Sequence, residues 1–183
     1  MSRRTLTRAA VPALGLALAV AAVVPATAGT ASSKATLKAI DKSDFKPNRY
    51  IQVGMRWDRD VTTIASGGTL TIVNKTEEPH TFSLVKKSQV PRSLAQMDAC
   101  FRPSGVCGKL AMAHGAVDPA TGEDRDPTVP LVNVGKEGFD QPGDSIVFGP
   151  HSKTKVMITA KKGTQLHFLC VPHPWMQARL DVE

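Results

Sequence analysis

Three side chains that could bind a metal lie close together near the end of the 183-residue chain: Cys170, His173 and Met176. The segment 166–176 reads L-H-F-L-C-V-P-H-P-W-M, so each donor follows the previous one after three residues. Two prolines flank the histidine, Pro172 and Pro174. Proline fixes its own φ angle and favours an extended conformation in the residue before it. We therefore expect a stiff loop that directs a thiol, an imidazole and a thioether toward one point.

A strand expected over residues 164–170 places this loop against a hydrophobic core. Alternate residues of a strand share a face, so Leu166, Phe168 and Cys170 point the same way. Because the first two are large and apolar, that face is expected to be the inner one. Cys170 is thus predicted to lie at the inner end of a core strand.

A fourth donor comes from a distant segment, N-K-T-E-E-P-H-T, which runs from Asn74 to Thr81. In the strand expected over 79–85, His80 shares a face with Phe82 and Leu84. Its imidazole should therefore also point into the core, near the end of its strand.

The four side chains make a donor set with defined chemistry. Two histidines, one cysteine and a weakly bound methionine are the ligands of blue-copper electron-transfer sites. The thiolate is a soft ligand suited to copper, and imidazole suits copper in both oxidation states. We therefore expect one copper ion, cycling between Cu(I) and Cu(II), bound by His80, Cys170, His173 and Met176.

These two segments resemble those of the cupredoxins. The loop C-V-P-H-P-W-M is similar to the short ligand loop of amicyanin-like members, and V-N-K-T-E-E-P-H-T is similar to the first-histidine segment of amicyanin and plastocyanin. The resemblance covers about 50–85 and 144–182, and it implies a Greek-key β-sandwich that carries single electrons. It also implies supporting roles around the metal for Asn74, Thr81 and the two loop prolines. Thr81 stands where these proteins usually have Asn, although its backbone N–H could still reach the sulfur.

The resemblance further implies how electrons would leave the site. His173 should break the surface within an apolar patch made of Pro172, Pro174 and Trp175. Such a patch suits transient docking of redox proteins, with this chain acting as a monomer.

Two other functions remain open beside electron transfer. The first is a periplasmic or extracellular copper chaperone or storage protein, and the second is an interaction module that has lost its metal. An enzyme is not expected: the neighbours of Cys170 are Leu169 and Val171, whereas multicopper oxidases and copper nitrite reductases have a histidine there.

In the rest of the chain, apolar and polar residues alternate within short segments that are bounded by turn residues. This pattern predicts an all-β sandwich of seven to eight strands. The expected strands cover residues 51–58, 69–74, 79–85, 144–149, 154–160, 164–170 and 177–182. The segment 86–142 breaks this rhythm and is interpreted as an insertion with short helices at 93–101 and 105–115. His114, His151 and His167 are not expected to bind the metal.

The chain has three cysteines, and an exported protein favours their pairing. Cys100 and Cys107 lie close together within the insertion, so we expect one local disulfide between them. Cys170 then remains as a free thiol.

The first residues predict export. Three arginines, an apolar run over 9–24 and an A-T-A triplet describe a signal peptide at 1–28, of the Sec or twin-arginine type. A flexible leader at 29–35 and one domain at 36–183 should follow, in the periplasm or outside the cell. No later segment is apolar enough for stable membrane insertion. The mature part has twenty basic and sixteen acidic residues, a net charge of +4, which with scattered positive charges argues against binding nucleic acid.

Overall fold

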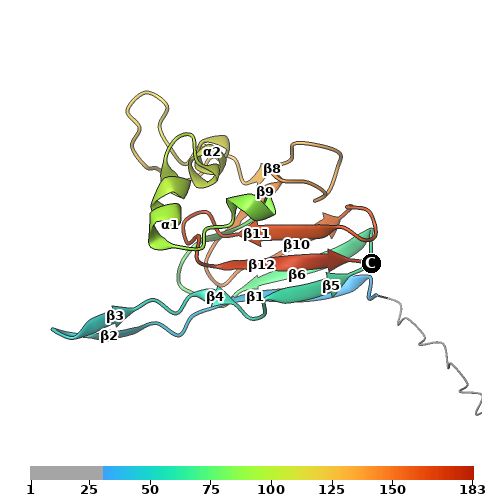
Figure 1. Ribbon diagram of the computed structural model, residues 1–183, viewed down its shortest axis with the longest axis horizontal. Coiled ribbons are helices and arrows are strands. Elements are labelled where there is room, and N and C mark those ends of the chain that lie inside the picture. Colours follow the sequence, from blue (N-terminus) through green and yellow to red (C-terminus); the bar gives the residue numbers. More distant parts are fainter. Residues whose placement is uncertain (1–30) are drawn as a thin grey trace, which may run out of the picture.

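The computed structural model describes residues 31–183, and the expected signal peptide lies outside this range. Two β-sheets enclose a common core (Figure 1). The first sheet has the order β10 (Lys153–Ile158), β6 (Gly68–Asn74), β1 (Lys34–Ile40), β4 (Arg56–Trp57). The second has the order β5 (Val61–Ile64), β12 (Gln177–Val182), β11 (Gln165–Leu169), β7 (His80–Val85), β9 (Ser145–Phe148), β8 (Leu131–Val132). The prediction of an all-β sandwich is confirmed.

Alternation of apolar side chains fills the space between the sheets. In β6 every second residue is buried, as expected for a strand with one face on the core. The centre of the core is aromatic: the rings of Phe82 and Phe168 lie 4.6 Å apart, and Trp57 packs edge-on against Phe168 at 5.5 Å. Removing a buried aromatic ring of this kind costs about 3–5 kcal/mol. The three rings come from β4, β7 and β11, so their contacts hold these strands against one another.

The segment expected as a single strand over 51–58 is different in the structure. It divides into β3 (Tyr50–Gln52), which pairs with β2 (Asp44–Lys46) in a separate two-stranded sheet, and the short β4. The β2–β3 hairpin projects from the body of the protein (Figure 1). Ile51 and Val53 are 74% and 49% exposed, whereas Trp57 is buried. The alternating apolar residues were expected to face the core, but only Met55 and Trp57 pack against it because the hairpin leaves the sandwich.

The insertion begins with the 3₁₀ turn η1 (Lys87–Gln89) and continues with α1 (Leu94–Phe101) and α2 (Val106–Ala113). Ser93 caps α1 by accepting a hydrogen bond from the N–H of Gln96. The disulfide between Cys100 and Cys107 is confirmed, with Cα atoms 4.9 Å apart. Both cysteines pack with Val85 and Leu169, so the helices cover one side of the second sheet. Within 31–183 no helix is long and apolar enough to cross a membrane.

The expected leader and the end of the insertion both join the sandwich more closely than the sequence suggested. β1 begins at Lys34, which pairs with Thr69, so the last residues of the expected leader belong to the sheet. Near the end of the insertion, Leu131 pairs with Ile146, and Phe139 is buried in the main core. The segment 86–142 is thus anchored to the sandwich by its own residues.

Candidate metal centre

Three of the four expected ligands meet at one end of the sandwich. His80 is the first residue of β7, while Cys170 and His173 lie in the loop between β11 and β12. The Cys170 Sγ lies 3.5 Å from His80 Nδ1 and 3.7 Å from His173 Nδ1. The two Nδ1 atoms are 3.0 Å apart. One thiol and two imidazole nitrogens therefore converge within 4.8 Å, as a shared metal ion requires.

The loop that carries two of these donors is held by its own backbone. The N–H of His173 donates to the Cys170 carbonyl at 3.2 Å, and the N–H of Met176 donates to the His173 carbonyl at 2.7 Å. The N–H of Cys170 donates to the Met176 carbonyl at 2.9 Å and closes the loop. Trp57 Nε1 donates to the same carbonyl at 3.1 Å, which ties the loop to the core. Met176 is fully buried there, and its role as a weak axial ligand remains a prediction.

The segment before His80 is organised by Asn74, which is almost completely buried. Its side-chain amide donates to the carbonyls of Glu78 and Gly149 at 2.8 and 2.9 Å. Its oxygen accepts hydrogen bonds from both the N–H and the hydroxyl of Thr76, each at 2.9 Å. Asn74 thus fixes the turn that delivers His80 to the site.

Thr76 is a residue that the sequence analysis missed. Its hydroxyl lies 2.8 Å from His80 Nε2. When Nε2 carries the proton and donates to this oxygen, the Nδ1 lone pair is left facing the other donors. A hydroxyl four positions before a ligand histidine is a weak signal, since only the turn built by Asn74 brings the two together.

Thr81 joins the two ligand segments. Its N–H donates to the Cys170 sulfur at 3.3 Å, and its hydroxyl oxygen accepts from the N–H of Val171 at 2.7 Å. The backbone contact expected from the sequence is therefore present despite the change from Asn to Thr. These bonds link the start of β7 to the residue after β11.

The electrostatics of the site suit a bound cation. Burial raises the pKa of the Cys170 thiol to about 12, although hydrogen bonds from Thr81 and His173 oppose this shift. Burial, reinforced by the nearby His173, lowers the pKa of His80 to about 4. Burial also lowers the pKa of His173. Both imidazoles are thus neutral near pH 7, the form that binds metals, and a metal must displace the proton of the thiol. A soft thiol beside two neutral imidazoles fits copper.

The cluster lies where two neighbouring strands of the second sheet meet at one end of the sandwich. The first histidine starts β7, and the other donors lie in the loop after β11, the strand that pairs with β7. The expected β-sandwich with a disulfide-tied, partly helical insertion is confirmed.

No family model matches the sequence, and no curated protein matches it. Similar solved structures include an auracyanin from Roseiflexus castenholzii, with 17% identity over 84% of this chain and 98% of that chain and a TM-score of 0.40. Auracyanin A from Chloroflexus aurantiacus, a "blue" copper protein, has 16% identity over 82% and 98% of the two chains and a TM-score of 0.41. Amicyanin from Paracoccus versutus has 17% identity over 88% and 87% and a TM-score of 0.38. Because each TM-score is below 0.5, the interpretation of the metal centre rests on its own geometry.

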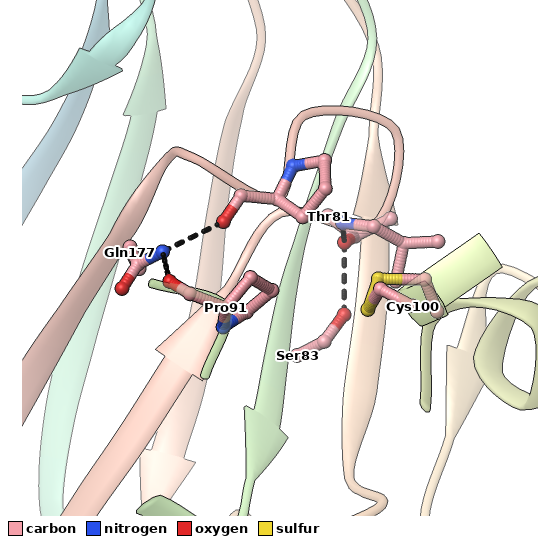
Figure 2. The surroundings of a disulfide bond; sticks show 8 residues. Thr81, Ser83, Pro91, Cys100 and Gln177 are labelled. Carbon is pink, nitrogen blue, oxygen red and sulfur yellow. Dashed lines mark hydrogen bonds between the residues drawn. A yellow bond between two sulfur atoms is a disulfide. The ribbon is translucent and has the colours of Figure 1, made fainter. Parts of the chain in front are cut away.

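The expected surface patch is only partly present. Pro172 and Trp175 are exposed, and His173, whose ring lies 5.2 Å from that of Trp175, is half-buried. Pro174 is buried instead, so its expected place in the patch is corrected. Its carbonyl accepts from Gln177 Nε2 at 3.0 Å, and Gln177 also donates to the Pro91 carbonyl at 2.8 Å (Figure 2). The insertion thereby covers this side of the loop.

The remaining histidines of the described chain lie outside the cluster of three donors. His151 is exposed and contacts Glu77 at 2.9 Å, and His167 lies on β11 facing away from Cys170. His114, expected only at the end of a helix, is almost completely buried. It contacts Ser145 and Val129, a role that nothing in its sequence neighbourhood indicated.

Proposed function

We propose that this chain is a mononuclear blue-copper protein that carries single electrons between redox partners. The observation that carries the proposal is the buried convergence of Cys170, His80 and His173 within 4.8 Å. When bound, copper supplies the one-electron redox couple, and the chain supplies the ligands. His80 and His173 would bind through Nδ1 and Cys170 through Sγ, with the Met176 thioether as the weak fourth ligand.

Rigidity of the surroundings supports an electron carrier. Three backbone hydrogen bonds close the ligand loop, and Asn74 and Thr81 fix the opposite segment. Because the ligands are held in place, their geometry changes little between Cu(I) and Cu(II). The reorganisation energy of electron transfer is therefore small. The same enclosure disfavours a copper chaperone, which needs ligands that exchange readily with an acceptor.

Electrons would leave through His173. This residue is half-buried beside the exposed Trp175 and Pro172, so its imidazole bridges the buried sulfur and the surface. A small apolar contact of this kind suits weak, short-lived docking of a redox protein. Copper use with a disulfide is consistent with action outside the cytoplasm, after removal of the expected signal peptide.

Voltammetry and chelator competition on the copper-loaded protein test the proposal together. An electron carrier should give one reversible one-electron wave and should release copper slowly to a chelator. A matched control is the double variant Cys100→Ser/Cys107→Ser, which removes the other cysteines and should keep the wave. Rapid release of copper without a reversible wave would favour the chaperone or storage function instead.

A further inference from the structure

The β2–β3 hairpin has the features of a strand pair that lacks a further strand. Within residues 31–183 its sheet contains only β2 and β3, and every residue of both strands is exposed. A hairpin of two strands is marginally stable in water, whereas three or more strands that share an apolar face are stable. Figure 1 shows the hairpin extending beyond the sandwich. Its outer edges therefore present unpaired backbone groups to which another strand can bind.

One face of the hairpin is apolar. Phe45 and Ile51 lie directly opposite each other and are 65% and 74% exposed. Val53 continues the alternation of β3 on the same side and is 49% exposed. Exposed apolar residues that are scattered singly are normal, but a contiguous group of them marks an interaction site. The hairpin therefore has an apolar face that a partner can cover.

The opposite face carries charges. The Asp44 Oδ2 accepts a hydrogen bond from the Tyr50 hydroxyl at 2.6 Å, and Lys46 Nζ lies 5.8 Å from the centre of the Tyr50 ring. Both charged side chains thus lie on the side of the hairpin that holds Tyr50. Because Asp44 and Lys46 flank Phe45, β2 reads acid, aromatic, base.

This order is complementary to itself when two such strands run antiparallel. If the β2 strands of two copies pair about Phe45, the two Phe45 side chains face each other and Asp44 of each copy faces Lys46 of the other. The same register, continued beyond the strand, brings Asp41 toward Arg49 of the second copy. Aromatic pairs and opposite charges directly across from each other stabilise antiparallel strands, whereas like charges destabilise them. The charges of this segment therefore favour a second copy of the same chain.

The outer edge of β3 lacks this complementarity. Two copies that paired there about Ile51 would place Tyr50 opposite Gln52, with no charge pair between them. The sequence of the hairpin thus favours pairing through β2.

We propose that two copies of this protein associate through the outer edges of their β2 strands. The two hairpins then form one four-stranded antiparallel sheet in the order β3, β2, β2, β3, with a two-fold axis beside Phe45. Each copy contributes the same residues, as a two-fold interface requires. This arrangement differs from the monomer that the family resemblance implies. It does not depend on the proposed electron-transfer function, because no residue of the metal centre takes part.

The dimer should be weak. Stable complexes bury about 1,200 Å² or more, and two three-residue strands offer less than this. We therefore expect a dimer that forms at high protein concentration and dissociates on dilution. The hairpin leaves the protein beside the metal centre, since Trp175 Nε1 donates to the Met55 carbonyl at 3.2 Å. In the proposed register, the turn of one hairpin reaches the base of the other and thus this part of the surface.

Sedimentation of the copper-loaded protein at increasing concentration tests the dimer. The mean mass of the parent should rise from that of one chain toward that of two. Asp44→Lys places lysine opposite lysine, and Lys46→Asp places acid opposite acid, so each should raise the dissociation constant about tenfold or more. An equimolar mixture of the two variants should associate as the parent does, because every acid again faces a base. A mixture that remains monomeric would overturn the antiparallel pairing.

Three further variants test the apolar face and serve as controls. Ile51→Lys places a charge on that face and should prevent association. Leu94→Lys is the matched control, because Leu94 is 75% exposed on α1, and it should associate as the parent does. Tyr50→Phe removes the hydrogen bond to Asp44 but keeps the charge, so it should also associate normally. All these positions are exposed, and the free energy of unfolding should be nearly unchanged. Association of Ile51→Lys at the parent's level would contradict the proposal.

The proposed function and this inference fail separately. If the parent has the mass of one chain at every concentration, the dimer is wrong whatever its absorption spectrum. If the parent is monomeric and Ile51→Lys, unlike Leu94→Lys, slows electron exchange with a c-type cytochrome, the hairpin binds a redox protein and not a second copy. If the parent forms the dimer but shows no copper charge-transfer band, only the proposed function is wrong.

Discussion

The Nδ1 atoms of His80 and His173 lie 3.0 Å apart although the residues are 93 positions apart in the chain. Two imidazoles can approach this closely only when at least one of the facing nitrogens carries no proton. Burial, together with the neighbouring ring, keeps the pKa of His80 at about 4, and burial also lowers the pKa of His173. The fold therefore brings two neutral imidazoles together, and this arrangement makes the stability of the copper-free protein depend on pH.

The copper-free protein should lose stability as the pH falls from about 6.5 toward 4. In the unfolded chain a histidine takes up its proton near pH 6.5, whereas folded His80 resists protonation down to about pH 4. The stabilisation that depends on neutral His80 is thus fully present above pH 6.5. It decreases as the pH falls and the unfolded chain takes up the proton. Alone it amounts to about 3 kcal/mol, measurable by urea unfolding at several pH values. In His80→Gln the free energy of unfolding should depend less steeply on pH. An unchanged pH dependence would contradict the lowered pKa of His80.

Asn74→Ala should destabilise the turn before His80. The side chain makes four hydrogen bonds within a buried site, so its loss should lower the free energy of unfolding by about 2–3 kcal/mol. Denaturant unfolding of the copper-free protein measures this directly. Asn133→Ala is the matched control, because Asn133 also bonds a carbonyl but lies at an exposed position. Equal losses for the two variants would mean that the turn does not depend on Asn74.

Thr76→Val should weaken copper binding more than it weakens folding. The Thr76 hydroxyl is the partner of His80 Nε2, and loss of such a partner lowers metal affinity about 10–100-fold. Competition with a chelator of known affinity measures the change. Thr159→Val, which removes an exposed hydroxyl bonded to the Glu137 carbonyl, should bind copper as the parent does. An affinity for Thr76→Val within twofold of the parent would show that Thr76 does not orient His80.

The disulfide should stabilise the insertion and not the metal centre. It closes a short loop, since its cysteines are seven positions apart, and such a loop is worth about 2 kcal/mol. In Cys100→Ser/Cys107→Ser we expect a lower unfolding free energy by about this amount, with faster hydrogen exchange confined to α1 and α2. A loss of copper absorption in this variant would show that the insertion is needed to hold the ligands.

The sandwich and the convergence of three donors could be predicted because each depends on local pattern. Alternation in β6, β7 and β11 identified the inner faces, and the prolines beside His173 identified a tight loop. The cysteines of the disulfide could be paired because they lie close together and Cys170 lies far away. Alternation, prolines within a loop and the spacing of cysteines involve residues close together in the chain, so they can be recognised in the sequence.

The features that could not be predicted depend on contacts between distant segments. The alternation that ends at Trp57 does not show that Ile51 leaves the sandwich on a hairpin. Pro174 is buried, and its carbonyl shares the Gln177 amide with the carbonyl of Pro91 in the insertion. His114 meets Ser145 only because the insertion folds back over β9. None of these contacts leaves a periodic or spacing signal in the sequence.

The visible absorption spectrum of the copper-loaded protein, compared with that of Cys170→Ser, tests the central claim most directly. The buried thiolate should give the parent an intense blue charge-transfer band at a stoichiometry of one copper per chain. Cys170→Ser should lose this band because an alcohol cannot replace the sulfur, while Cys100→Ser/Cys107→Ser should keep it. A parent without the band, or a Cys170→Ser spectrum that matches the parent's, would contradict the account.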